Sequence, residues 1–194
     1  HGTSRRQRQM CIRDSYEIQG SLCLGTSLNK LGYDHVFYVK IASGSVFSYL
    51  VNKGDANAVR RTVNNILLDG PSLRAYRHFP NVGKRKSWAA ADASKRGIEL
   101  SIISSHEDEI YESVQNEDKW GFETNFLDNS ELEFGKDLNN WVIQNVLFKV
   151  LFPAEFHGQS AVEAATMLSD EFNQNINKLE KVNIYTHEPA LRII

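Results

Sequence analysis

Glu155 and His157 stand between a run of large apolar residues and a predicted helix, in the stretch LFPAEFHGQSAVEAA at residues 151–165. Ser160-x-x-Glu163 matches a capping box, which marks the first turn of a helix. Unpaired N–H groups and the helix dipole at such a turn favour an anion. His157 could act there as a general acid or base, with Glu155 orienting it or acting alone. The alternative is that His157 only hydrogen-bonds the backbone at the cap.

A second concentration of chemistry lies in the loop predicted at residues 70–86, which is basic although the chain is acidic. Its polar members are Arg74, Tyr76, Arg77, His78, Lys84, Arg85 and Lys86. Guanidinium groups match carboxylates bidentately, so the loop could bind a multiply charged small anion. It could also bind RNA through stacking aromatic residues, or it could be a solvated loop whose arginines cap helices. These three interpretations remain open from residue types alone.

Lys149 is the only charge in the apolar run WVIQNVLFKVLF at residues 141–152. Burial would depress the pKa of this lysine toward a value useful in catalysis, whereas snorkelling would return its amine to solvent. Cys11 and Cys23 are too few for a disulfide framework and are not spaced as metal ligands. We therefore predict no metal site from these residues.

The composition is that of a globular chain with one or two domains: 194 residues, 41% apolar and 24% charged. No apolar run approaches the ~20 residues of a membrane-spanning helix, so we expect a soluble protein. Residues 1–15, HGTSRRQRQMCIRDS, resemble a translated sequencing adapter, and we expect them to be unstructured. Without them the net charge is (22 − 4) − (24 − 1) = −5, which argues against a general nucleic-acid coat.

Apolar periodicity and turn residues predict a mainly α-helical fold. The expected helices cover residues 16–31, 35–51, 55–70, from 87 onward, and 160–175, with a strand as the alternative for the first half of residues 35–51. Residues 106–137 form an acidic surface excursion with eleven Asp or Glu and two Lys, and residues 182–187 form a strand. We predict a helical bundle-like domain over residues 16–150. The start of a small α/β domain, truncated, would follow over residues 151–194.

Three long strings resemble the MmgE/PrpD family: DGPSLRAYRHFPNVGKRKSWAAADASKRG, NVLFKVLFPAEFHGQSAVEAA and LEKVNIYTHEPALRII. The resemblance covers residues 16–194. It implies a cofactor-independent lyase that removes water from 2-methylcitrate to give 2-methyl-cis-aconitate in propionate breakdown. It also implies a large helical domain, a smaller α/β domain, an active site between them and a homodimer. The enzyme would lie in the cytoplasm, or in the mitochondrial matrix of a eukaryote, without a nucleic-acid or membrane partner.

Site roles follow from the same resemblance. Arg74, Arg77 and His78, with Tyr76 beside them, would hold the carboxylates of the tricarboxylate substrate. Lys86, Lys149 and His157 would form the acid–base and electrostatic set, with Glu155 as an orienter or an alternative base. Glu155 stands where relatives carry a histidine, and the family's Asp and His motif would lie upstream of residue 16. We therefore expect this piece to be inactive alone, and we keep citrate dehydration, cis-aconitate decarboxylation and an RNA-binding module as alternatives.

Overall fold

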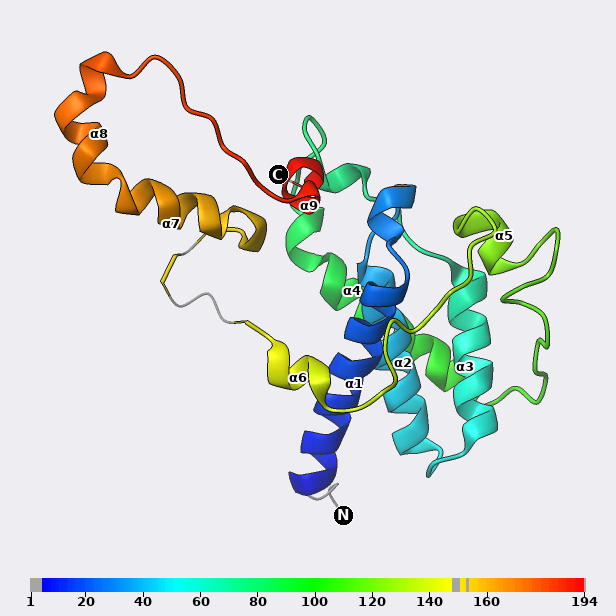
Figure 1. Ribbon diagram of the computed structural model, residues 1–194. Coiled ribbons are helices and arrows are strands. Elements are labelled where there is room, and N and C mark those ends of the chain that lie inside the picture. The colour runs from blue at the N-terminus through cyan, green and yellow to red at the C-terminus, as the bar shows by residue number, and fades with distance from the viewer. Residues whose placement is uncertain (1–4, 148–150, 153, 194) are drawn as a thin grey trace. The chain divides into compact units, whose positions relative to one another are not determined.

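A computed structural model describes residues 5–147, 151–152 and 154–193 (Figure 1). The chain forms two compact units, His1–Asn145 and Val146–Ile194, and each is described by itself. The described residues are helical, with single turns of 3₁₀ helix and no strand, so the prediction of a mainly α fold is confirmed. None of the helices in the described ranges combines the length and the apolar character that a membrane crossing requires.

The first unit begins with helix α1, Arg5–Gly25, which is longer than predicted. The prediction that residues 1–15 are unstructured is wrong for residues 5–15, because they continue this helix. Their Arg, Gln and Met residues are good helix formers, and neither glycine nor proline interrupts them. The chain then makes a single 3₁₀ turn, η1, at Leu28–Leu31, which ends at Gly32 with a positive φ of 84°.

Three further helices, α2 (Val36–Val51), α3 (Ala56–Asp69) and α4 (Arg85–Ser104), complete the bundle. The α3 helix starts as predicted, because Asp55 accepts a hydrogen bond from the backbone N–H of Asn57 at 2.9 Å. The α2 and α4 helices pack closely, since a Cβ on Gly97 would overlap the backbone oxygen of Lys40. The absence of a side chain at Gly97 therefore allows the two helices to approach closely.

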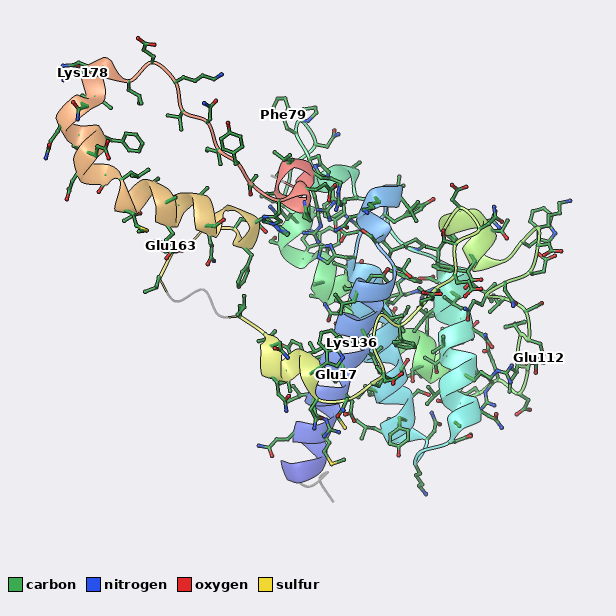
Figure 2. The ribbon with its side chains drawn as sticks, viewed as in Figure 1. Glu17, Phe79, Glu112, Lys136, Glu163 and Lys178 are labelled. Carbon is green, nitrogen blue, oxygen red and sulfur yellow. The ribbon has the colours of Figure 1, made fainter. Side chains whose placement is uncertain are left out.

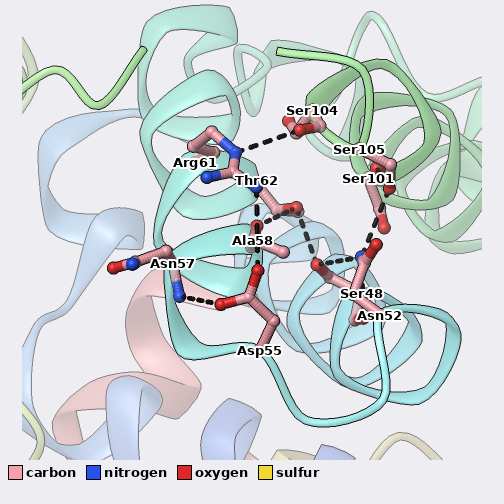
Figure 3. A network of polar contacts seen from close by, with 10 residues as sticks. All are labelled: Ser48, Asn52, Asp55, Asn57, Ala58, Arg61, Thr62, Ser101, Ser104 and Ser105. Atoms are coloured by element: carbon pink, nitrogen blue, oxygen red, sulfur yellow. Dashed lines mark hydrogen bonds and ion pairs between the residues drawn. The ribbon is translucent and has the colours of Figure 1, made fainter. Parts of the chain in front are cut away.

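Polar side chains hold the ends of α2, α3 and α4 together (Figure 3). The buried Thr62 hydroxyl contacts the Ser48 hydroxyl at 3.1 Å. Asn52 at the end of α2 donates to the Ser105 hydroxyl at 3.2 Å, and Arg61 donates to the backbone oxygen of Ser104 at 3.1 Å. These bonds join the three helices at the end of the bundle opposite the loop at 70–84.

The main apolar core contains Leu22, Leu28, Phe37, Tyr38, Ile41, Ile66, Leu67, Leu100, Phe122 and Leu127. Phe122 and Leu127 belong to the acidic segment, in and after the short helix α5, Phe122–Phe126. Phe122 stacks on Phe37 with ring centroids 5.1 Å apart. The prediction that residues 106–137 are only a solvated excursion is thus wrong at these positions, where the segment anchors itself in the core.

The unit is completed by α6, Trp141–Asn145, whose first turn is capped from α1. Glu17 accepts from the backbone N–H of Val142 at 2.8 Å. Figure 2 marks Glu17 on α1 next to this segment. Lys149 lies outside the described residues.

The second unit contains a 3₁₀ turn, η3, Phe156–Gly158, and then helices α7 (Gln159–Met167) and α8 (Ser169–Asn175), the turn η4 (Ile176–Lys178) and helix α9 (Glu188–Ile193). The capping box is wrong, because the N-cap residue of α7 is Gly158 and Ser160 lies inside the helix. The strand predicted at residues 182–187 is also wrong for the structure as described, since this segment is extended coil beside α7. A strand needs a hydrogen-bonding partner, and alternation alone does not supply one.

Candidate active site

A short antiparallel pairing brings the basic loop against the start of α2. The backbone N–H of Asp34 donates to Ser72 O at 2.8 Å, and the N–H of Arg74 donates to Gly32 O at 2.8 Å. The isolated bridge between Tyr33 and Leu73 lies between these bonds. Side chains of the loop therefore gather around the residues that precede α2.

Asp34 is the centre of this cluster and is fully buried. Its Oδ1 accepts from the backbone N–H of Val36 at 3.1 Å, and its Oδ2 accepts from Arg77 Nε at 2.6 Å. The Tyr76 hydroxyl donates to the same Oδ2. A buried carboxylate with three donors is a stable ionised group, because each bond favours the charged form.

The pKa shifts of the three partners agree with this arrangement. Burial alone would raise the pKa of Asp34, but hydrogen bonds from Arg77, Tyr76 and the Val36 amide hold it below its usual range. Burial would lower the pKa of Arg77, but the bond to Asp34 raises it. The pKa of Tyr76 is raised by burial and by the neighbouring Asp34 carboxylate. The positive charge of Arg77 is thus matched by Asp34, and Tyr76 stays a proton donor.

Arg74, only 6% exposed, is the second centre of the cluster. Its Nη1 donates to Asn29 Oδ1 at 3.0 Å and lies 3.2 Å from His35 Nδ1, and its Nε donates to His78 Nε2 at 3.2 Å. Burial lowers the pKa of His35, and the charges of Arg77 and Arg74 add to this against the opposing effect of Asp34. His35 is therefore a neutral imidazole at pH 7, and its side chain is 40% exposed.

The first turn of α4 carries an unusual concentration of cations. Lys84 is the N-cap residue, Arg85 and Lys86 follow it, and the turn contains no acidic residue and no side-chain cap. Arg85 lies over the Tyr76 ring at 5.2 Å and over the Trp88 ring at 4.6 Å, so it joins this turn to the cluster. Positive charge at a helix N-terminus opposes the helix dipole, whereas a bound anion there would be favoured.

A cavity of about 290 Å³ lies beside the cluster, between α2, the end of α3 and α4. Most of the charge near it is paired inside the fold. Lys40 donates to Asp69 Oδ2 at 2.7 Å, and Arg96 donates to Asp69 Oδ1 at 2.8 Å. Arg85 also lines the cavity and belongs to the cluster as well. The cations at the start of α4 form no ion pair with the residues that the structure describes, so the cluster is the stronger candidate for a ligand site.

The structure brings four of the predicted residues together: Arg74, Tyr76, Arg77 and His78. Lys86 stands exposed on the adjoining first turn of α4. In the second unit, Glu155 accepts from the backbone N–H of His157 at 2.7 Å, and His157 Nδ1 lies 2.9 Å from His187 Nε2. Lys149 belongs to the three residues, 148–150, that the structure does not describe.

Sequence reasoning missed Asp34, His35 and Asn29, which complete the cluster. Asp34 directly precedes a helix, and a sequence pattern of this kind is normally interpreted as a cap. Its bond to the Val36 amide fits that interpretation. The bonds to Tyr76 and Arg77 come from residues more than forty positions along the chain, and no local pattern reveals them. An adjacent Asp-His pair is nevertheless a sequence pattern that a search for acid–base groups could include.

These features define a class: a mainly helical domain in which a basic loop packs against a buried carboxylate. The chain belongs to the MmgE/PrpD family, because residues 11–135 match the MmgE/PrpD N-terminal domain. It is 40% identical over 183 residues to a 2-methylcitrate dehydratase of Escherichia coli O157:H7, covering 93% of this chain and 38% of the relative. It is 38% identical over 183 residues to the "2-methylcitrate dehydratase, mitochondrial" of Yarrowia lipolytica, covering 93% and 35%. The chain thus spans little more than a third of these relatives.

Proposed function

We propose that the complete protein is a dehydratase that removes water from 2-methylcitrate to give 2-methyl-cis-aconitate, and that this chain supplies part of its substrate site. The observation that carries the proposal is the cluster in which Arg74, Arg77 and Arg85 converge around Asp34 and His35. The relatives named 2-methylcitrate dehydratase support the choice of substrate.

The charge of the cluster suits a tricarboxylate. Three guanidinium groups against the Asp34 carboxylate, with His35 neutral, give 3 − 1 = +2. Lys84 and Lys86 add positive charge at the start of α4. Since Asp34 already matches Arg77, we propose that the substrate carboxylates approach from the side of Arg85 and Lys86. A guanidinium fork would bind one carboxylate bidentately, and a lysine would act as a point charge.

Elimination of water needs three kinds of group. A base must take the proton next to a carboxylate, an acid must protonate the leaving tertiary hydroxyl, and cations must stabilise the charge that develops on the carboxylate. His35 is neutral and partly exposed, so it can serve as a base or, through its N–H, as a hydrogen-bond donor. Lys86, Lys149, His157 and Glu155 remain proposed members of the same site.

The proposal extends to the setting of the enzyme. We propose a homodimer without a nucleic-acid partner, in the cytoplasm or, in a eukaryote, in the mitochondrial matrix, as the name of the Yarrowia lipolytica relative suggests. We also propose that residues 151–194 begin a second, smaller domain. Sedimentation of the complete protein would test the dimer.

The test of function uses the complete protein and 2-methylcitrate, with the rise in ultraviolet absorbance of the unsaturated acid as the readout. His35→Gln and Lys86→Ala should each lower kcat by about a hundredfold or more, as expected for loss of an acid–base or charge-stabilising group. Lys95→Ala is the matched control, because Lys95 is 74% exposed and pairs only with Glu99 within α4 among the contacts described. Normal turnover in both site variants would overturn the roles proposed for His35 and Lys86. Release of carbon dioxide from cis-aconitate, without dehydration of 2-methylcitrate, would show that the enzyme is a decarboxylase instead.

A further inference from the structure

The donors of Arg74 restrict where the protons of two histidines can be. A guanidinium has only N–H donors and no acceptor, so any ring nitrogen that is hydrogen-bonded to it must carry a lone pair. Arg74 Nη1 lies 3.2 Å from His35 Nδ1, and Arg74 Nε donates to His78 Nε2 at 3.2 Å. The two histidines therefore present different ring nitrogens to the same side chain.

We infer that Arg74 is a positioning residue that holds His35 and His78 in opposite neutral tautomers. His35 carries its proton on Nε2, and His78 carries its proton on Nδ1. In a neutral imidazole the bond made by one nitrogen decides which nitrogen keeps the proton. Arg74 is held in place for this task because it is buried, because Asn29 accepts from its Nη1 at 3.0 Å and because its backbone N–H is bonded to Gly32.

The surroundings of His35 offer two possible partners to its Nδ1 atom, so the position of its proton decides which bond forms. Asp34 Oδ1 lies 3.3 Å from the same Nδ1, so this atom has a choice of two partners. Neutral Nδ1 accepts from Arg74, whereas a protonated Nδ1 would donate to Asp34 and leave the Arg74 N–H without that acceptor. Arg77 and Tyr76 already donate to the other oxygen of Asp34, and His78 faces Arg74 from the loop. Arg74 thus favours the state in which His35 offers an Nε2–H group.

The catalytic meaning of this arrangement rests on the proposed function. If His35 acts on the substrate, the nitrogen that faces away from Arg74 and Asp34 is Nε2, and it starts the cycle protonated. His35 would then act through its Nε2–H as a hydrogen-bond donor to the leaving hydroxyl, and not as the base.

The direct test is long-range ¹H–¹⁵N correlation spectroscopy of the chain labelled with ¹⁵N-histidine at pH 8, where the tautomer of each ring is visible. His35→Gln and His78→Gln assign the two sets of signals. His106, an exposed histidine, provides the reference for a ring in solvent. We expect the Nε2–H form for His35 and the Nδ1–H form for His78. The result for His78 is the more demanding, because an imidazole in water favours Nε2–H. An Nε2–H form for His78, or an Nδ1–H form for His35, would overturn the inference.

Arg74→Lys separates positioning from charge. The lysine keeps the positive charge but cannot span both rings as a fork does. We expect His78 to lose its Nδ1–H form and to approach the mixture shown by His106, while the backbone amide spectrum outside residues 29–36 and 72–79 stays unchanged. A His78 that keeps its tautomer would show that Arg74 does not set it. Should the variant fail to fold, the tautomers of the unaltered chain still decide the inference.

These measurements are independent of turnover. If the complete protein does not dehydrate 2-methylcitrate while both tautomers are as expected, the proposed function fails and the role of Arg74 stands. If turnover is normal and the tautomers are reversed, the proposed function stands and the role of Arg74 fails. In an active enzyme, Arg74→Lys should lower kcat with a smaller change in KM and should shift the pH dependence of kcat, because the tautomer of His35 is no longer fixed.

Discussion

Asp34→Asn tests whether the buried carboxylate organises the site. The substitution keeps the shape of the side chain and an oxygen that can accept from the Val36 amide. It removes the negative charge that Arg77 contacts at 2.6 Å. Because the Arg77 side chain is only 13% exposed, water cannot fully replace that charge. It also places an NH₂ group or a neutral oxygen opposite two donors, Arg77 Nε and the Tyr76 hydroxyl.

The expected loss of stability follows from the burial of the pair. Breaking a buried ion pair by removing one partner costs about 3–5 kcal/mol, because the remaining charge is left without compensation. Asparagine retains the backbone bond, so the lower end, about 3 kcal/mol, applies. This corresponds to about a hundredfold change in the folding equilibrium, since 1.4 kcal/mol is a factor of ten. With a urea dependence of about 2 kcal/mol/M, the unfolding midpoint should fall by about 1.5 M.

The assay is urea unfolding at pH 7, followed by far-ultraviolet circular dichroism. Asp55→Asn is the matched control, because Asp55 caps α3 from a side chain that is 49% exposed, and asparagine caps a helix about as well. The control should lose less than about 1 kcal/mol. Equal midpoints for the two variants would refute the view that Asp34 holds the loop through a buried ion pair.

The unaltered chain and Asp34→Asn also give a test of how stability depends on pH, with a defined sign. The pKa of Asp34 is lowered in the folded state, so its contribution to stability is present above its ordinary value of 3.8. That contribution is lost as the pH falls through the lower, folded-state pKa. The difference between the unaltered chain and Asp34→Asn should therefore not narrow from pH 7 to pH 5, where the loss of Asp34 also lowers the pKa of His35 further, and it should close only below about pH 3.8. A difference that closes between pH 7 and pH 5 would point to another titrating group.

Two further substitutions test the packing that positions the site. Gly97→Ala should destabilise the chain by about 1–3 kcal/mol in thermal unfolding, because its Cβ would overlap the Lys40 backbone oxygen, whereas Gly83→Ala, with no atom nearer than Asn81 O at 3.9 Å, should change little. An unchanged Tm for Gly97→Ala would contradict the close approach of α2 and α4. Phe122→Ala should cost about 3–4 kcal/mol in urea unfolding because the ring is 2% exposed, while Trp120→Ala, 75% exposed, should cost less than about 1 kcal/mol. Similar losses for the two aromatic residues would place the acidic segment outside the core.

The helices of the first unit could be predicted because their signals are local. Asp55 and Gly70 mark the ends of α3, and both act as the sequence suggests. The acidic segment failed because a stretch that is polar on average hides Phe122 and Leu127, whose burial depends on distant partners such as Phe37. The prediction of a strand at residues 182–187 was wrong for a related reason. Alternation of apolar and polar residues indicates which side chains share a face, but it does not supply the partner strand that must bond to the segment.

The same distinction applies to the site. Residue types identified Arg74, Tyr76, Arg77 and His78, since guanidinium, phenol and imidazole groups concentrated in one loop indicate anion chemistry. Their partners could not be found in this way. Asp34 meets Tyr76 and Arg77 across forty-two and forty-three positions, through a two-bond pairing that has no periodicity. What changed most is the role of Arg77, which the sequence offered as a carboxylate binder and which the structure ties to Asp34.

Because Arg77 is paired with Asp34, the expected position of the ligand shifts toward the start of α4. Lys84, Arg85 and Lys86 oppose the dipole of a helix of 20 residues, and no acidic residue in its first turn relieves them. Such a violation of a local rule is expected where function requires it, because helix stability alone would place acidic residues there. A bound carboxylate would relieve both the repulsion among the cations and their conflict with the dipole. The cluster around Asp34 and Arg74 then has a distinct part, which is to hold the aromatic platform under Arg85 and the imidazoles beside it in one arrangement before the ligand arrives.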